Sequence, residues 1–265
     1  MAATNRWSSL PLVTAVLALA GSTVLAAQES GPAHAPDFRA LEKIAPLVFL
    51  PKPNAPFMAI ARTTWVRTLP DGSTETHENQ RVVARDMDGR TFQERRTFIP
   101  VPAVGNEQSE AYLLVYTDPV AHTATNCSVP AKTCRLMNSY EPMERRPEAP
   151  AGLQPDGTTY LTRENLGIDT YEGLEVQRSR ETFTFFKQSA GNTKIILRVI
   201  DYWYSPVLGV NVKVVRHDPR DGDQTLWLTD ISQTAADPTT FQIPSGYRVL
   251  DTLMQRPMYT GSAPH

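Results

Sequence analysis

The chain has 265 residues, of which 41% are hydrophobic, and carries a formal charge of −2 from 26 Lys and Arg against 28 Asp and Glu. No cluster of basic residues stands clear of compensating acids, so the charge pattern argues against nucleic acid as a partner. The chain is long enough for one large all-β domain, because sandwiches and barrels reach about 200–250 residues.

The N-terminus has the layout of a secretory signal peptide. Arg6 lies in a short polar opening, and an apolar run follows from Leu10 to Leu25. That run is shorter than the roughly 20 apolar residues of a spanning helix, and polar residues interrupt it. We predict a signal peptide over 1–26, cleaved after Ala26 or alternatively after Ala27. The mature protein is then exported, periplasmic or extracellular, with no stable membrane span; the alternative is an uncleaved tether.

A proline-rich lead follows over residues 27–56. It contains one predicted short helix, Asp37–Ile44, in which Asp37 is placed to cap the N-terminus. We assign residues 57–250 to a single β-rich domain and 251–265 to a C-terminal tail.

Turn signals such as Pro70-Asp71-Gly72 and Asp221-Gly222 recur along the domain. They separate segments rich in β-branched and aromatic residues, which is typical of antiparallel hairpins. The predicted strands are Phe57–Leu69, Thr74–Met87, Arg90–Ile99, Ala111–Thr117, His122–Cys127, Cys134–Ser139, Thr158–Asn165, Leu174–Lys187, Lys194–Tyr204, Val210–His217 and Gln224–Thr234.

The fold class that these segments predict is mainly β: one long, curved antiparallel sheet, partly covered by the short helix and by loops. Ile195–Ile200 is apolar at nearly every position, so we expect a central strand covered on both faces. The stretch Glu141–Pro155 predicts a long exposed loop or a boundary between two halves of the sheet.

Cys127 and Cys134 are the two cysteines of the chain. An exported protein meets an oxidising compartment, so we predict a disulfide that pins the loop between them. A redox pair is the alternative, but it requires closer spacing.

No constellation in the sequence predicts catalysis, a metal site or a cofactor. The five histidines are dispersed, with no zinc-ligand spacing, and no nucleophile elbow is present. We expect His77 and His217 at surface or turn positions. The acidic run Asp218–Asp223 could be imagined as a calcium site, but a hairpin turn is the preferred interpretation.

Aromatic residues within the strands either fill a core or line a hydrophobic cavity on a concave face. The candidate cavity residues are Trp65, Phe92, Tyr112, Phe183, Phe185, Tyr202, Trp203 and Trp227.

The sequence resembles a family of exported acidobacterial proteins that is similar to the outer-membrane lipoprotein-sorting superfamily of LolA-like and RseB-like half-barrels. The residues that carry the resemblance are Arg85-Asp86, Asp88-Gly89-Arg90, Tyr116–Ala121, Glu164–Gly167, Tyr171–Gly173, Asp201–Gly209, Asp218–Arg220, Gly222, Leu228–Ile231 and Asp237–Tyr247.

The resemblance implies a half-barrel fold with a lipid-binding concave face. It does not imply any catalysed reaction. Within its last motif, Asp237-Pro238 is expected to start a short turn, and Phe241 with Ile243 to pack under the sheet. Pro244 and Gly246 would then lead the chain into a last strand.

Three functions follow in order. The first is a non-enzymatic periplasmic binding or carrier protein for an apolar ligand such as a lipid or acyl chain. The second is a cell-envelope sensor or adaptor that recognises a protein partner, and the third is an envelope hydrolase. A large apolar cavity would favour the first, and an exposed apolar patch the second.

Overall fold

The computed structural model describes residues 52–102, 109–138, 150–189, 191–251 and 253. All described residues belong to one compact unit, Ala35–His265. The predicted signal peptide, the helix Asp37–Ile44 and most of the C-terminal tail therefore lie outside the described residues.

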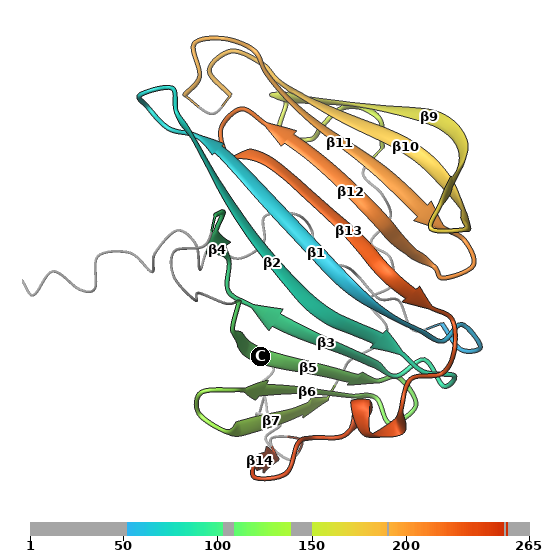
Figure 1. Cartoon of the computed structure of the whole chain (residues 1–265). Helices are drawn as coiled ribbons and strands as arrows, with labels where there is room; N and C mark the ends of the chain where they lie inside the picture. Colours follow the sequence, from blue (N-terminus) through green and yellow to red (C-terminus); the bar gives the residue numbers. More distant parts are fainter. Residues whose placement is uncertain (1–51, 103–108, 139–149, 190, 252, 254–265) are drawn as a thin grey trace, which may run out of the picture. The chain divides into compact units, whose positions relative to one another are not determined.

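The described residues form one open, mostly antiparallel sheet (Figure 1). Its strands, in chain order, are β1 (Phe57–Thr68), β2 (Thr74–Arg85), β3 (Thr91–Arg96), β4 (Ile99–Pro100), β5 (Ala111–Asp118), β6 (Thr123–Ser128), β7 (Thr133–Asn138), β8 (Gly152–Leu153), β9 (Thr159–Tyr171), β10 (Leu174–Phe185), β11 (Ile196–Ser205), β12 (Val210–Asp218), β13 (Gly222–Ser232) and β14 (Arg248–Asp251). They lie in the order β14-β7-β6-β5-β3-β2-β1-β13-β12-β11-β10-β9-β8, with β4 paired to β2.

All eleven predicted strands have counterparts, and their turns have the expected chemistry. The predicted Arg90–Ile99 is divided between β3 and β4, and β9 continues beyond the predicted end at Asn165 to Tyr171. Gly222 closes the β12–β13 hairpin with φ +89°, and a Cβ there would lie 2.2 Å from the carbonyl oxygen of Val66. Only glycine fits such a close approach. The run Asp218–Asp223 is thus a hairpin turn, as predicted. The two-residue strands β4 and β8 were not predicted.

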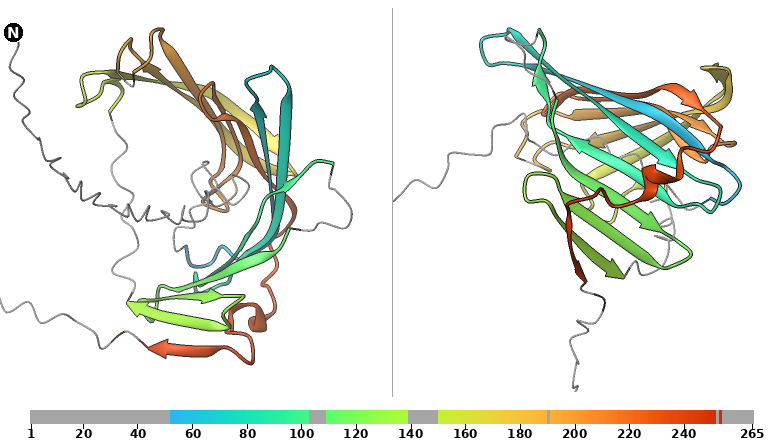
Figure 2. Two further views of the ribbon diagram at one scale, coloured as in Figure 1. Left: turned by 90° about the vertical axis from the view of Figure 1, so that its left-hand side faces the viewer. Right: turned by 60° about the horizontal axis from the view of Figure 1, so that its bottom comes forward.

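The sheet curves into an open half-barrel (Figure 2), the architecture that the resemblance implies. Register shifts interrupt the ladders between Arg178 and Ser179 of β10 and between Trp203 and Tyr204 of β11. Such β-bulges bend a strand and increase its twist. They therefore contribute to the curvature and separate a concave from a convex face.

The larger apolar cluster is centred on the concave face of the sheet. It comprises Phe57, Ala59, Ala61, Val83, Leu174, Val176, Leu208, Val210, Val212, Val214, Leu226 and Leu228. Arg85 lies beside it with 0% exposure. Its side chain donates hydrogen bonds to the carbonyl oxygen of Ala55, at 2.9 Å, and to that of Leu208. One guanidinium thus joins the segment before β1 to the β11–β12 turn.

A second cluster lies on the convex face of β2, β3 and β5–β7, built from Ala84, Phe92, Leu114, Tyr116, Cys127 and Cys134. The segment after β13 packs against it, including the short 3-10 helix η2 (Pro238–Phe241), which runs on the outside of the curve (Figure 2). Phe241 and Ile243 contact the cluster as expected. The chain then enters β14, which pairs in parallel with β7.

Two expectations from the sequence are wrong. His77 is buried, at 9% exposure, because it faces the concave side next to Trp65, with ring centroids 6.2 Å apart. The strand β11 does lie between β10 and β12, but it is not covered on both faces: Ile195 and Leu197 are 55% and 48% exposed.

Replacing Arg85 with Leu tests the buried guanidinium. The variant leaves two buried carbonyl oxygens without this donor, so we expect a loss of about 2–5 kcal/mol in the free energy of unfolding. Arg67→Leu is the control. Arg67 lies over the Trp65 ring at 5.0 Å and forms an ion pair with Glu75 at 3.0 Å, with side chains 30% and 32% exposed, and such a partly exposed pair contributes about 0–1 kcal/mol. Equal losses in urea denaturation of the two variants would contradict the assigned role.

The Cys127–Cys134 disulfide is present and joins β6 to β7 within the convex cluster. Thiol labelling of unfolded, unreduced protein should therefore find no free cysteine. Because the bond closes a short loop, its removal should cost on the order of 2–3 kcal/mol and leave the β-sheet circular dichroism nearly unchanged. A collapse of the sheet spectrum on reduction would show that the bond holds more than a local shape.

Candidate functional site

The structure distributes the eight candidate aromatic residues over both faces of the sheet. By strand register, Trp65, Phe183, Phe185 and Tyr202 lie on the concave face, and Phe92, Tyr112, Trp203 and Trp227 on the convex face. Trp203 also packs against the larger apolar cluster. Phe92 belongs to the convex cluster, and Tyr112 is 39% exposed. Trp203 and Trp227 flank Lys213 in one cross-strand row. The eight residues therefore do not form a single lining.

Trp65 is buried at the end of the concave face that includes the β12–β13 turn. Its indole N–H donates to the carbonyl oxygen of Asp221 at 2.7 Å, and its ring meets Phe98 edge-on at 6.3 Å. A buried indole requires such an acceptor. Trp65 is thus a packed residue that anchors the turn.

The middle of the concave face is polar although it is buried. Arg81 is 1% exposed and donates to the hydroxyl of Thr63 at 3.2 Å and to the side-chain oxygen of Asn79 at 3.5 Å. Buried polar groups of this kind persist only when they are hydrogen-bonded. The concave face therefore changes along its strands from an apolar to a polar surface.

Three arginines and two aspartates meet at the β12–β13 turn, in what we call the arginine group: Arg198, Arg216, Asp218, Arg220 and Asp221. Asp218 is fully buried and accepts from Arg216 at 3.1 Å and from Arg220 at 2.8 Å. Asp221 accepts from Arg216 at 3.2 Å. Each aspartate thus has an arginine partner.

The arginines control the ionisation of Asp218. Burial alone would raise its pKa, but hydrogen bonds from the side chain and backbone of Arg220, together with Arg216, outweigh burial and lower the pKa to about 2. Asp218 is consequently a carboxylate at any physiological pH, and it fixes the positions of both arginines.

Arg198 joins this group from β11 and stacks on aromatic rings. Its guanidinium carbon lies 4.0 Å from the centroid of Phe183 and 5.4 Å from that of Phe185. Arg220 lies over the same Phe185 ring at 4.2 Å. Burial and repulsion from Arg216 lower the pKa of Arg198. The rings attract both cations through their faces.

The concave side chains of β10 and β11 continue the buried apolar cluster but are less covered. Phe183, Phe185, Ile200 and Tyr202 are half-buried, and the last two pack against the cluster. Apolar side chains with free surface beside a finished core can cover an apolar ligand.

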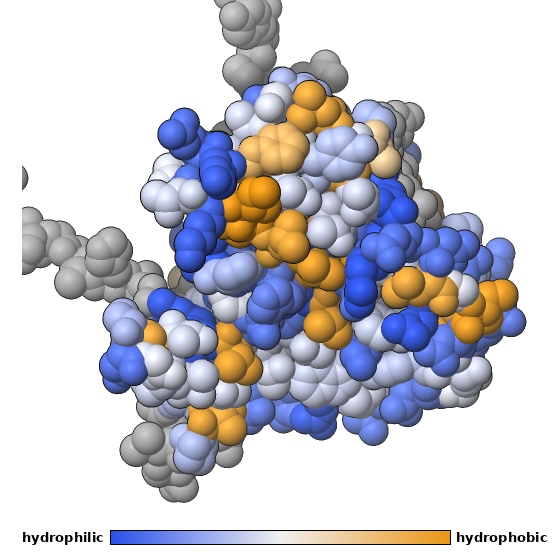
Figure 3. Space-filling model, turned by 90° about the horizontal axis from the view of Figure 1, so that it is seen from above, coloured by the Kyte–Doolittle hydropathy of each residue, from blue (hydrophilic) through white to orange (hydrophobic). Residues whose placement is uncertain are grey.

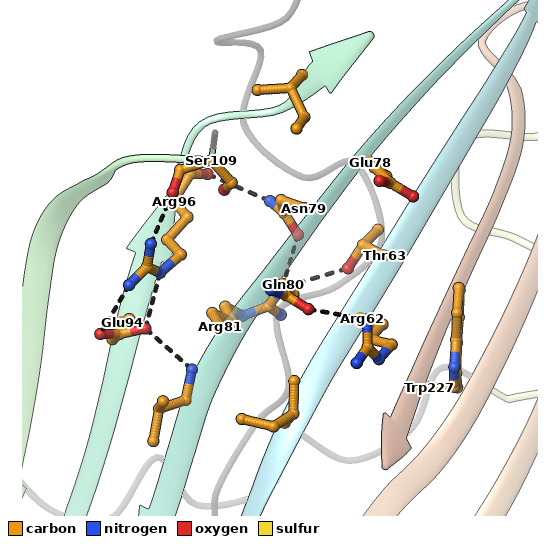
Figure 4. A pocket seen from close by; sticks show the side chains of 13 residues that line it. Arg62, Thr63, Glu78, Asn79, Gln80, Arg81, Glu94, Arg96, Ser109 and Trp227 are labelled. Atoms are coloured by element: carbon orange, nitrogen blue, oxygen red, sulfur yellow. Dashed lines mark hydrogen bonds and ion pairs between the residues drawn. The ribbon is translucent and has the colours of Figure 1, made fainter. Parts of the chain in front are cut away.

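A separate pocket of about 650 Å³ lies where β2 and β3 diverge (Figure 4). β2 pairs with β3 at Val83–Arg85 and with β4 at His77 and Glu78, so the ladder is interrupted between these points. The pocket is lined by Ile60, Arg62, Thr63, Glu78, Asn79, Gln80, Arg81, Val82, Glu94, Arg96, Ile99, Ser109 and Trp227.

The side chain of Glu94 replaces a backbone acceptor that is missing where the β2–β3 ladder is interrupted. Its carboxylate accepts from the backbone N–H of Val82 at 3.0 Å and from Nε of Arg96 at 2.8 Å. Figure 4 shows Arg62 and Gln80 side by side on the paired strands β1 and β2, where Arg62 donates to the Gln80 side chain at 2.8 Å. Arg62, Arg81, Glu94 and Arg96 of the pocket are held by hydrogen bonds to neighbouring groups, so we assign no chemistry to this pocket.

Sequence reasoning identified Phe183, Phe185 and Tyr202 but not the arginine group beside them. The available signal was the alternation of Arg198, Ile200 and Tyr202, which share one face of a strand. Arg216 and Arg220 lie in or beside the acidic turn, which we considered only for its carboxylates.

Within the described ranges, no group of three or more His, Cys, Asp or Glu is placed to hold a metal ion. The described part of the chain also contains no helix that is long and apolar enough to cross a membrane.

No protein-family model and no curated protein matches the sequence. Solved structures with a similar fold include an uncharacterized conserved protein from Thermus thermophilus, at 9% identity and TM-score 0.37, covering 75% of this chain and 91% of that one. MucB matches at 10% identity and TM-score 0.35, over 76% of this chain and 62% of MucB. A LolA superfamily protein from Nitrosomonas europaea matches at 9% identity and TM-score 0.27, over 73% and 92%.

Replacing Asp218 with Asn tests the buried carboxylate. The pKa of Asp218 is lower in the folded protein than its ordinary value of 3.8, so ionisation stabilises the fold above that value and the effect is lost as the pH falls toward 2. The parent should therefore exceed the variant in unfolding free energy near neutral pH, with a pH-dependent part of about 2 kcal/mol. The difference should shrink in acid; denaturation curves with a pH-independent difference would contradict the assignment.

Proposed function

We propose that the protein is a non-enzymatic binding or carrier protein of the cell envelope that holds an apolar ligand, such as a lipid or acyl chain, on the concave face of its sheet. The ligand chain would lie against β10 and β11 and extend toward the buried cluster. The arrangement supports binding rather than a reaction, because the carboxylates of the arginine group are held in ion pairs.

The observation that carries this proposal is the half-buried apolar surface next to a complete core. Ile200 and Tyr202 contact the buried cluster and still keep free surface. Phe183 and Phe185 on β10 are likewise only half-buried. A sheet that needed these side chains only for its own stability would bury them fully, as it buries Val212 and Leu228.

We also propose that the protein works outside the cytoplasm. The layout of residues 1–26 is that of a signal peptide. The Cys127–Cys134 bond is of the kind that persists in oxidising compartments.

A second candidate function is an envelope sensor or adaptor that binds a protein partner. It is favoured by hydrophobic residues that form a broken band on the face seen from above, bordered by hydrophilic residues (Figure 3). Among exposed residues of the sheet, Ile168 of β9 is 71% exposed and Leu197 of β11 48%. Exposed apolar patches of this kind mark interaction surfaces when they are large enough.

Neighbouring residues of β11 provide a matched test of the carrier function. Ile200 lies on the concave face and Val199 on the opposite face, and both are half-buried. Ile200→Gln should weaken binding of dodecanol several-fold, because it places a polar group against the ligand chain, whereas Val199→Gln should leave the affinity unchanged. Isothermal titration measures both.

Native mass spectrometry of protein purified from its own envelope provides a further check, because a retained lipid adds mass. Failure of the parent protein to bind dodecanol, together with the absence of added mass, would overturn the carrier function and favour the adaptor.

A further inference from the structure

The arginine group carries one more positive charge than its carboxylates compensate. Arg216 and Arg220 are both paired with the buried Asp218, and Asp221 adds a second carboxylate to Arg216. Arg198 is the third arginine of the group, and no carboxylate among the described residues forms an ion pair with it. The nearest acid along the same face of β10, Glu181, is already paired with Arg163 at 2.7 Å.

Arg198 is also held in a fixed place. Its guanidinium lies over the rings of Phe183 and Phe185, and its Nε atom is buried without a hydrogen-bond partner. Such a donor costs free energy unless an acceptor arrives. A guanidinium presents several donors in a planar fork that matches carboxylate and phosphate oxygens.

The same strand connects this cation to the apolar surface. Arg198, Ile200 and Tyr202 alternate along β11 on the concave face, and the last two pack against the buried cluster. A strand rises about 3.3 Å per residue, so an oxyanion at Arg198 would lie roughly 13 Å from the level of Tyr202. That span is about the length of a medium acyl chain.

We propose that Arg198 is the recognition residue for an oxyanion head group, phosphate or carboxylate, of an amphipathic ligand whose chain runs along β11 toward Tyr202. This inference rests on the proposed binding function and specifies its ligand class. Phe183 and Phe185 position the guanidinium, and the carboxylate of Asp218 compensates the charges of Arg216 and Arg220.

The experiment separates the head group from the chain. Isothermal titration is carried out with dodecyl phosphate, dodecanol and inorganic phosphate on the parent, Arg198→Gln and Arg178→Gln. Arg178 is the matched control, because its guanidinium also stacks on an aromatic ring, that of Trp203, at 4.8 Å from the ring centroid. Arg178 of β10 is the cross-strand partner of Trp203 of β11, and both lie on the face of the sheet opposite Arg198 by strand register. Circular dichroism verifies that each variant is folded, and Arg198→Lys, which keeps the charge, serves if Arg198→Gln does not fold.

We expect Arg198→Gln to bind dodecyl phosphate on the order of tenfold more weakly than the parent, through loss of a charge-assisted hydrogen bond, and dodecanol with unchanged affinity. Arg178→Gln should match the parent for both. Arg198→Lys should lie between the parent and Arg198→Gln for dodecyl phosphate.

Three results would overturn the proposal. Equal affinities of the parent and Arg198→Gln for dodecyl phosphate would remove the head-group site while leaving the carrier function intact. Binding of inorganic phosphate without dodecyl phosphate would identify a site for a free anion instead. A parent that binds none of the three compounds would defeat the carrier function and the head-group site together.

Discussion

The buried guanidinium of Arg85 is the interaction on which the rest of the structure depends. It is fully buried in the concave face, and it donates to carbonyl oxygens that are 30 and 123 residues away in sequence. Burial lowers the pKa of Arg85 to about 10. A cation is held there because its hydrogen bonds join the entry to β1 with the β11–β12 turn. Lys52 joins the same two segments, because its Nζ donates to the carbonyl oxygens of Pro206, at 2.6 Å, and Val207, at 3.0 Å.

From that junction, the concave face divides into two chemical regions. Next to Arg85 it is apolar and closed, whereas toward the β12–β13 turn it becomes polar and then cationic, through Arg81 and Arg198. The half-buried rings of β10 and β11 lie at this transition. The proposed ligand would need the same order of properties, with an apolar chain at one end and a negative charge at the other.

Turn chemistry made most of the fold predictable. In the β1–β2 hairpin, the carboxylate of Asp71 accepts from the backbone N–H and the hydroxyl of Ser73, at 2.9 and 2.6 Å, and Gly72 takes φ +84°. Each contact is local, so the sequence alone indicates it. The motif Asp237-Pro238 likewise starts η2, where the Asp237 side chain accepts from the backbone N–H of Thr239.

The face on which each aromatic residue lies could not be predicted in the same way. A bulge shifts the alternation of side chains in the strand that carries the extra residue. Opposite Trp203 and Tyr204 that residue is Val212 of β12, and its bulge follows from tertiary pairing rather than from a local motif. The burial of the arginines could not be predicted from the sequence for a related reason. Arginine is expected at the surface, and Arg85 is buried only because distant carbonyl oxygens come to meet it.

The last consequence concerns the margins of the open sheet. A half-barrel, unlike a closed barrel, leaves two strand edges whose backbone groups could recruit a second molecule and start polymerisation. Here one margin is the four-residue β14, laid in parallel along β7; at the other, the two-residue β8 pairs only with Tyr160 and Leu161 of β9. A margin as short as β14 offers few backbone groups for edge-to-edge pairing. By covering the edge of β7, β14 therefore limits self-association at this margin in addition to completing the sheet.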